Sequence, residues 1–311
     1  MKDRLISIMR ALWLTRHGEV RVPWRVALFL VSAAIIAMVL GVGLGWAGLT
    51  ARGVDRAVML ASVLAATALM TRVVNRKPFG AAGFGRTRGA GRDFGLGCLL
   101  GFLMMAGIFL IELGMGYVHP EFRPIPPGEA AGVLASSSLL FAMGALGEEI
   151  LFRGYPFQTI MQGVTFLPAA LGVAALFACA HLGNPNISIF ALVNIAMAGL
   201  WLSFAYLKTR TLWLQFGLHF SWNFCQTTLF SFPTSGFRME DRTFFFLNQE
   251  GPGWITGGNF GPEGGILATL AIMLCTWHLL KSPLYRREKG VVTLDSIEDL
   301  LGSGGVKGEA P

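Results

Sequence analysis

Two adjacent glutamates and an arginine interrupt an apolar stretch of the chain, which reads GEEILFRG at residues 147–154. A charged side chain inside a bilayer is costly, so each of these charges needs a partner or a function. Glu149 and Arg153 are four residues apart with the acid first, which is the favourable order for an ion pair on a helix. Glu148 lies about 140° from Arg153 around a helix of 3.6 residues per turn. We therefore expect Glu149 to be the paired, structural acid and Glu148 to keep a free carboxylate, which suits a general base or a proton relay.

Two histidines fall in other apolar stretches, each one helical turn from a second aromatic or polar side chain. Phe177 precedes His181 by four residues, and His219 precedes Asn223 by four, so each pair shares a helix face. A lone histidine in an apolar helix is more often hydrogen-bonded to a neighbouring helix than catalytic. Counted at 1.5 Å per residue from the basic end of each predicted helix, however, Glu148, His181 and His219 lie at depths of roughly 18, 22 and 12 Å. Such convergence from three helices indicates a buried reaction centre.

These side chains suit the hydrolysis of a peptide bond. Glu148 can activate a water that His181 also holds, while His219 and Asn223 donate hydrogen bonds to the oxyanion. Equally, Glu148, His181 and His219 can bind a divalent metal such as zinc, with water in the open position. Other membrane hydrolase chemistries lack their parts, because no predicted span contains an aspartate and no His-Glu-x-x-His or Gly-x-Ser-x-Gly motif occurs.

The composition predicts that these motifs lie on membrane-spanning helices. Of the 311 residues, 53% are apolar and 14% are charged, and the mean hydropathy is +0.57. Soluble proteins carry about 25% charged residues, so a soluble enzyme, a disordered chain and a secreted disulfide scaffold are all disfavoured. The net charge of +7 is scattered in short clusters, so no nucleic-acid partner is expected. The four cysteines lack zinc-site spacing and are expected to be buried free thiols.

Eight apolar runs approach or exceed the ~20 residues that cross a bilayer. They cover residues 24–49, 57–74, 94–117, 132–160, 166–182, 187–207, 211–232 and 264–281. We therefore expect an all-α polytopic membrane protein, with about eight transmembrane helices over 24–281 and the active site inside the bundle at about 132–232. The aromatic-rich and glycine-rich loop 233–262 either rests on the membrane face or caps an opening.

Basic residues predict the orientation, because Lys and Arg are retained on the cytoplasmic side. With both termini inside, sixteen of those up to residue 290 lie in cytoplasmic segments, namely Lys2, Arg4, Arg10, Arg16, Arg21, Arg76, Lys77, Arg86, Arg88, Arg92, Lys208, Arg210, Lys281, Arg286, Arg287 and Lys289. Only five lie outside, namely Arg52, Arg56, Arg123, Arg238 and Arg242. We expect a cell-membrane protein with a basic cytoplasmic segment at 1–23. The polar cytoplasmic tail at 282–311 is expected to be solvated and to lie outside any core.

The motifs at 148–153, 177–181 and 219–223 resemble, in order and in placement on three spans, the three signature motifs of the CPBP intramembrane protease family. That family joins the type II CAAX prenyl endopeptidases to bacteriocin-processing, immunity-type and lysostaphin-resistance-like proteins. The segment Arg76-Lys77-Pro78-Phe79-Gly80 also looks like its usual connector. The resemblance covers about residues 132–232 and leaves out the first span, the 233–262 loop and the tail.

The resemblance implies an eight-helix bundle with a site inside the membrane, reached from the cytoplasmic side in the prenyl endopeptidases. It implies that Glu148 activates water, that His181 assists, and that His219 and Asn223 form the oxyanion site. Members have been labelled metalloproteases, although a glutamate mechanism without a catalytic metal is better supported in the family.

The leading hypothesis is therefore an intramembrane endopeptidase. Its partners would be the bilayer and a peptide or membrane-associated protein, lipidated or not, and Glu149, Arg153 and Phe177 would support the site. No cofactor is expected apart from the alternative divalent metal. Two rival hypotheses remain open, namely a proton-coupled transporter and a non-catalytic immunity or binding protein, since buried Glu, His and Arg also mark ion pathways.

Overall fold

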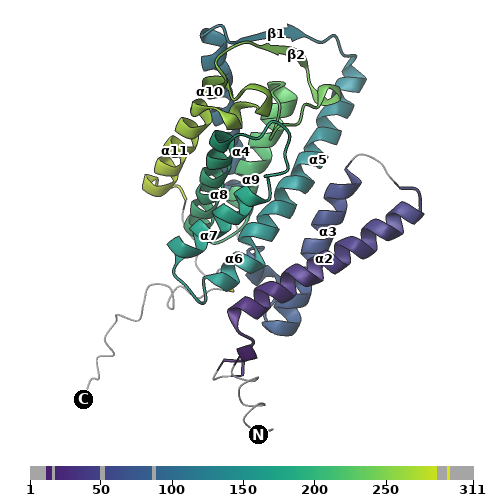
Figure 1. Cartoon of the computed structure of the whole chain (residues 1–311), viewed down its shortest axis with the longest axis vertical. Coiled ribbons are helices and arrows are strands. Elements are labelled where there is room, and N and C mark those ends of the chain that lie inside the picture. Colours follow the sequence, from purple (N-terminus) through teal and green to yellow (C-terminus); the bar gives the residue numbers. More distant parts are fainter. Residues whose placement is uncertain (1–11, 16–17, 50–52, 86–88, 286–292, 295–311) are drawn as a thin grey trace.

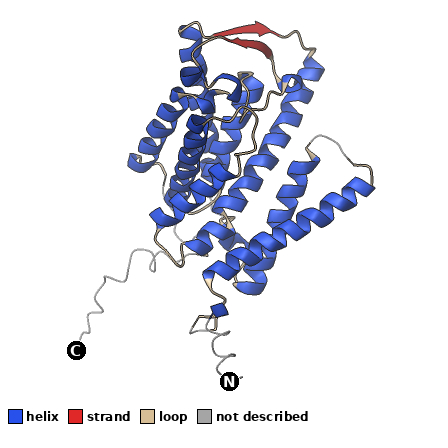
Figure 2. Cartoon of the chain, viewed as in Figure 1, coloured by secondary structure: helices blue, strands red, loops and turns tan. Residues whose placement is uncertain are grey.

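The computed structural model describes residues 12–15, 18–49, 53–85, 89–285 and 293–294, and within them the chain is mostly helical (Figures 1 and 2). The helices are α2 (Val22–Trp46), α3 (Val54–Leu69), α4 (Ala90–Gly114), α5 (Pro127–Arg153), α6 (Tyr155–Ile160), α7 (Phe166–Cys179), α8 (Ile189–Thr209), α9 (Trp213–Phe224), α10 (Gly253–Thr256) and α11 (Ile266–Lys281). Short π-helical turns extend α3 as η1 (Met70–Val74) and α9 as η3 (Cys225–Leu229). Four 3₁₀ turns complete the connectors, namely η2 (Phe79–Ala82), η4 (Glu240–Arg242), η5 (Gly258–Phe260) and η6 (Pro262–Gly264).

The predicted class of a polytopic helical membrane protein is confirmed, and each of the eight predicted spans contains a helix. Within the described residues, five helical segments are long and apolar enough to cross a membrane: Val22–Trp46, Val54–Val74, Ala90–Gly114, Pro127–Ile160 and Ile189–Thr209. The apolar helices α7 and α11 are shorter, with 14 and 16 residues. Helix length and composition therefore leave the predicted number of eight spans open.

The helices form a bundle with a hairpin of α2 and α3 along one side (Figure 1). That hairpin packs against the rest of the molecule mainly through α3 on α5 and α2 on α6. In the main bundle α4 lies along α9, α7 along α8, and α11 along α8 and α4. Because α5 contacts α9, and α8 contacts both α7 and α9, the three motif-bearing helices α5, α7 and α9 gather around a common centre.

Glycines allow α4 and α9 to approach so closely that their backbones touch. A methyl group built on Gly217 of α9 would overlap the carbonyl oxygen of Phe94, and one on Gly97 of α4 would overlap the carbonyl oxygen of Leu214. Small residues serve this purpose in membrane helix pairs, where van der Waals packing rather than the hydrophobic effect drives association. Since His219 lies two residues beyond Gly217, this contact also fixes the position of the third motif.

Gly217→Ala is therefore expected to force α4 and α9 apart. The overpacking should cost about 1–3 kcal/mol of unfolding free energy, and the displacement of His219 should slow any chemistry at the site. Gly107→Ala, also on α4, is the matched control, because a methyl group there meets nothing within 4 Å. Denaturation of both variants in detergent checks the prediction, and equal stabilities would contradict it.

A small two-stranded antiparallel sheet, which the sequence did not predict, closes one end of the bundle. Strand β1 (Val118–Phe122) pairs with β2 (Phe245–Gln249), with Val118 opposite Gln249 (Figure 2). It ties the connector between α4 and α5 to the long segment between η3 and α11. The 233–262 loop is therefore ordered structure at this end of the molecule, and part of it lines the cavity described below.

The C-terminal segment is not wholly solvated, so the expectation of a tail outside any core is wrong at the residues described there. Tyr285, Thr293 and Leu294 are all buried. The backbone nitrogen of Leu294 donates to the carbonyl oxygen of Ala81 at 3.1 Å, and Gln162 Nε2 donates to the carbonyl oxygen of Leu294 at 2.8 Å. The burial of Leu294, which follows Val291 and Val292 in the sequence, was not expected from the polar composition of the tail as a whole. The rest of the tail, and most of the predicted 1–23 segment, lie outside the described residues.

Candidate active site

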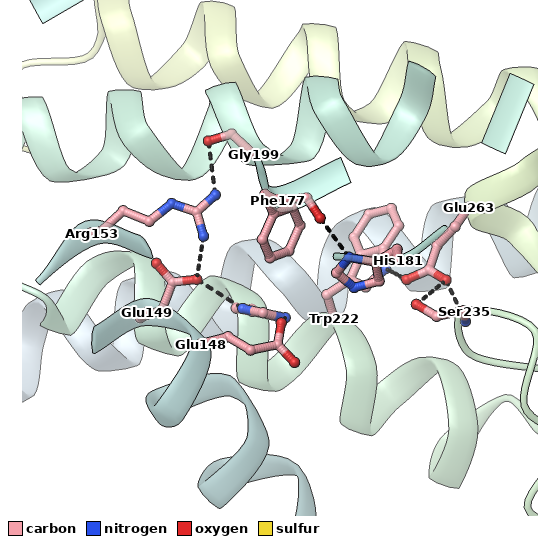
Figure 3. Close-up of polar contacts among 10 residues, drawn as sticks. Glu148, Glu149, Arg153, Phe177, His181, Gly199, Trp222, Ser235 and Glu263 are labelled. Atoms are coloured by element: carbon pink, nitrogen blue, oxygen red, sulfur yellow. Dashed lines mark hydrogen bonds and ion pairs between the residues drawn. The ribbon is translucent and has the colours of Figure 1, made fainter. Parts of the chain in front are cut away.

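A buried ion network joins α5, α8 and α9 (Figure 3). The ion pair expected between Glu149 and Arg153 is present, with 3.2 Å between Glu149 Oε1 and Arg153 Nη1 and both side chains fully buried. Arg153 Nη2 also donates to the carbonyl oxygen of Gly199 at 2.9 Å, and His219 Nδ1 lies 2.8 Å from the same Glu149 oxygen. One carboxylate thus fixes both an arginine on its own helix and a histidine from 70 positions further along the chain.

Phe177 packs between this network and the two histidines. The Arg153 guanidinium lies over its ring, 4.7 Å from the centroid, which is a cation–π geometry. The ring centroids of His181 and His219 lie 4.7 and 6.1 Å from that of Phe177. Phe177 therefore supports the positions of Arg153 and both imidazoles. The four-residue spacing had predicted this contact for His181 alone.

Glu148 differs from its neighbour in exposure and in partners. Its side chain is 22% exposed, whereas that of Glu149 is completely buried. Its nearest charged contact in the described structure is His219, with 3.6 Å between Glu148 Oε2 and His219 Nε2. That distance exceeds a direct hydrogen bond and leaves the carboxylate able to bind water.

His181 has a defined tautomer in its neutral form. Its Nδ1 lies 2.7 Å from the carbonyl oxygen of Phe177, one turn earlier in the chain. A carbonyl oxygen only accepts, so Nδ1 carries the proton and donates it. The Nε2 lone pair of the neutral ring is then available to accept a hydrogen bond from water or substrate.

Glu148, His181, His219 and Asn223 all line one cavity of about 330 Å³. The structure thus brings together the four side chains that the sequence predicted as catalytic, from α5, the turn after α7, and α9. Phe177 also lines the cavity, whereas Glu149 and Arg153 lie behind it and act on its walls. Most of the lining is apolar, including Phe141, Phe152, Ile195, Trp201, Leu202 and Ile272.

The cavity reaches one end of the bundle. Its lining includes Arg56 near the start of α3, Asn184 between α7 and α8, and Phe237 and Met239 after η3. Phe237 and Met239 lie in the same connector as β2, which together with β1 marks one end of the bundle in Figure 1. In the described part of the chain, no lining residue comes from the connectors 70–89, 154–165, 210–212 or 282–285 at the opposite end.

Glu263, which the sequence reasoning missed, is a second carboxylate on this cavity. Its Oε1 accepts from Trp222 Nε1 at 3.3 Å, and its Oε2 accepts from the backbone nitrogen and hydroxyl of Ser235 at 2.5 and 3.0 Å (Figure 3). Burial raises the pKa of Glu263, although the Ser235 hydrogen bonds and the nearby His181 act in the opposite direction. Glu263 lies one residue before the predicted span 264–281, so it was not among the acids expected to be buried in the membrane. An acid between a proline and a glycine at the start of an apolar run is the signal that could have found it.

A metal site does not fit the residues present. No group of three His, Cys, Asp or Glu side chains within the described residues is arranged to hold a metal ion. Glu148, His181 and His219, the alternative ligand set, share the cavity but do not form such a group. The cysteines are all free, and Cys179 is exposed rather than buried as expected.

Residues 130–225, from α5 into η3, match the family described as Type II CAAX prenyl endopeptidase Rce1-like. The match spans about a third of the chain and contains all three motifs. No curated protein and no solved structure shows a significant match to the chain. The family resemblance suggested by the motifs is confirmed by this match.

Proposed function

The chain belongs to the CPBP family through its Rce1-like segment, and from this premise we propose that it is an intramembrane endopeptidase that uses glutamate-activated water. One observation carries the proposal. The free carboxylate of Glu148 and the imidazole of His181 face the same apolar cavity, beside His219 and Asn223. A base and a second hydrogen-bonding group around one water are what peptide hydrolysis requires.

The proposed reaction proceeds by addition and elimination. A water held between Glu148 and His181 Nε2 attacks the scissile carbonyl as Glu148 removes its proton, so a C–O bond forms and the carbonyl oxygen becomes an oxyanion. The side-chain amide of Asn223, with Nε2–H of His219 when that ring is doubly protonated, donates hydrogen bonds to the oxyanion. The C–N bond then breaks, and Glu148 returns its proton to the leaving amine.

Glu149, Arg153 and Phe177 do not take part in these bond changes. Glu149 orients His219 through Nδ1, and Arg153 compensates the buried charge of Glu149. The substrate in this proposal is an extended peptide or membrane-protein segment, with or without a lipid, because the cavity is a pocket between helices with mainly apolar walls.

The test is cleavage by purified protein in liposomes, with fragments of lipidated and unlipidated peptides identified by mass spectrometry. We expect fragments from the wild type, formed at the same rate in the presence of a strong chelator. Binding of a peptide without any fragment would favour a non-catalytic binding protein, and loss of cleavage in the chelator would favour the metal scheme.

We also propose that substrate reaches the site from the end of the bundle that carries β1 and β2. The cavity lining includes residues from connectors at that end, and basic residues concentrate at the other. By the positive-inside rule, the β1–β2 end faces away from the cytoplasm. This differs from the cytoplasmic access that the family resemblance implies.

Thiol labelling of intact cells checks the direction of access. In a Cys179→Ala background, Asn184→Cys at the cavity should react with a membrane-impermeant maleimide added outside. Lys281→Cys, at the exposed end of α11, should react only after the membrane is permeabilised. The opposite labelling pattern would place the cavity on the cytoplasmic side.

A further inference from the structure

The segment between η3 and η6 folds back over the cavity, and polar contacts from η3, from the connector between α7 and α8, and from α8 hold it and η6 in place. Gln226 Nε2 donates to the carbonyl oxygen of Pro233 at 2.6 Å, and Asn184 Nδ2 donates to that of Ser235 at 3.0 Å. From α8, Asn194 Nδ2 donates to the carbonyl oxygen of Glu263 at 2.9 Å. The cavity wall formed by 234–239 is therefore held by specific polar contacts, and Glu263 belongs to them.

The side-chain contacts of Glu263 suit its ionised form. All three groups bonded to the carboxylate are donors, namely Trp222 Nε1, the Ser235 nitrogen and the Ser235 hydroxyl. An ionised carboxylate only accepts hydrogen bonds. A protonated carboxyl group carries an O–H donor, which would face the other donors without an acceptor. The buried carboxylate thus has the hydrogen bonds of a negative charge but no arginine or lysine bonded to it in the described structure.

His181 is the nearby group with which a negative charge on Glu263 can interact. The two side chains line the same cavity and interact electrostatically. The other titratable or charged side chains facing this cavity are Glu148 from α5, His219 from α9 and Arg56 from α3. Of these groups His181 is the one whose charge acts on Glu263, whereas His219 approaches Glu148 at 3.6 Å and is bonded to Glu149.

We propose that Glu263 is a positioning residue for the hydrolysis: it fastens the 234–239 wall through Ser235 and holds a negative charge beside His181. The inference rests on the proposed function. When the attacking water donates a hydrogen bond to His181 Nε2, positive charge develops on the imidazole, and the fixed carboxylate stabilises it. Glu263 touches neither the water nor the substrate, and no bond to it changes during the reaction.

Three substitutions distinguish the effect of the Glu263 charge from the effect of its hydrogen bonds to Ser235. Glu263→Gln removes the charge and sets an amide NH₂ against the donors of Ser235, Glu263→Asp keeps the charge on a shorter side chain, and Ser235→Ala keeps the charge but removes one donor. We expect Glu263→Gln to lower kcat roughly tenfold or more with little change in KM. Glu263→Asp should restore part of that loss, and Ser235→Ala should have a smaller effect.

The pH dependence gives a readout that a purely structural role would not move. The pKa of Glu263 is raised, so its charge is lost as pH falls through that pKa, and wild-type kcat should fall with it. Stability has the opposite sign, because an acid whose pKa is raised by folding stabilises the protein below its ordinary pKa and loses that contribution as pH rises. Glu263→Gln should therefore lose the acidic limb of activity, and its melting temperature should lack the part of the wild type's fall at rising pH that comes from ionising Glu263.

The closing experiment measures kcat, KM and melting temperature of the wild type and the three variants from about pH 4 to 9, a range that spans the ordinary and the raised pKa of a glutamate. A low kcat in Glu263→Gln, with a missing acidic limb and a melting temperature that falls less at alkaline pH than that of the wild type, supports the proposal. Wild-type kinetics in Glu263→Gln, or a loss of activity that follows a lower melting temperature at every pH, overturns it while leaving the proposed function intact. Absence of cleavage by the wild type overturns both.

Discussion

Glu148→Gln is expected to reduce peptide cleavage by about 10²–10⁴-fold, the usual contribution of a general base. Glutamine has nearly the same shape as glutamate but cannot accept a proton from the attacking water. The fold should be unaffected, because the closest charged contact of Glu148 is the 3.6 Å approach to His219, which is not a direct hydrogen bond. Single-turnover cleavage assays together with thermal denaturation measure the two effects separately.

The matched control is Glu121→Gln, an exposed acid on β1 at the same end as the mouth of the cavity. It removes the same charge without touching the site and should cleave as fast as the wild type. A Glu148→Gln variant that retains more than a tenth of wild-type activity would assign the base to another residue. Cleavage lost equally in both variants would point to a general effect of charge rather than to catalysis.

Contacts between residues that are close together in the sequence could be predicted well. The Glu149–Arg153 ion pair and the Phe177–His181 contact follow from four-residue spacing on a helix, and both are present. The helical spans follow from the lengths of apolar runs, because lipid requires the backbone to satisfy its own hydrogen bonds. A shared site for three motifs could be inferred because three polar centres at similar depth have few other ways to be buried.

Features that depend on tertiary packing could not be predicted. The bond from His219 to Glu149 connects residues 70 positions apart, and nothing local distinguishes Glu149 from Glu148 as its acceptor. The pairing of β1 with β2 joins two five-residue segments separated by most of the bundle. Glu263 lies in a loop, where a carboxylate is usually solvated, and only the fold-back of Ser235 and the position of Trp222 bury it.

Arg153→Met should destabilise the protein by about 3–5 kcal/mol, as expected when one partner of a buried ion pair is removed. Arg153 and Glu149 are both 0% exposed, and Glu149 Oε2 has no hydrogen-bond partner within the described residues. Without the guanidinium, the Glu149 carboxylate would keep only the bond to His219. Removing one partner of an exposed ion pair would lower the unfolding free energy by only about 0–1 kcal/mol. Chemical denaturation in detergent therefore distinguishes a buried pair from an exposed one.

The double variant Glu149→Gln/Arg153→Met tests the cause of that loss. It leaves no charge at either position, and the amide oxygen introduced by the first substitution can still accept from His219 Nδ1, so most of the lost stability should return. Cleavage should remain slow, because a neutral amide holds His219 less firmly than a carboxylate does. A double variant no more stable than Arg153→Met would mean that the arginine acts mainly through packing on Phe177 and its bond to Gly199. Recovered stability without recovered cleavage would show that the buried pair is retained for the geometry of the site and not for the stability of the fold.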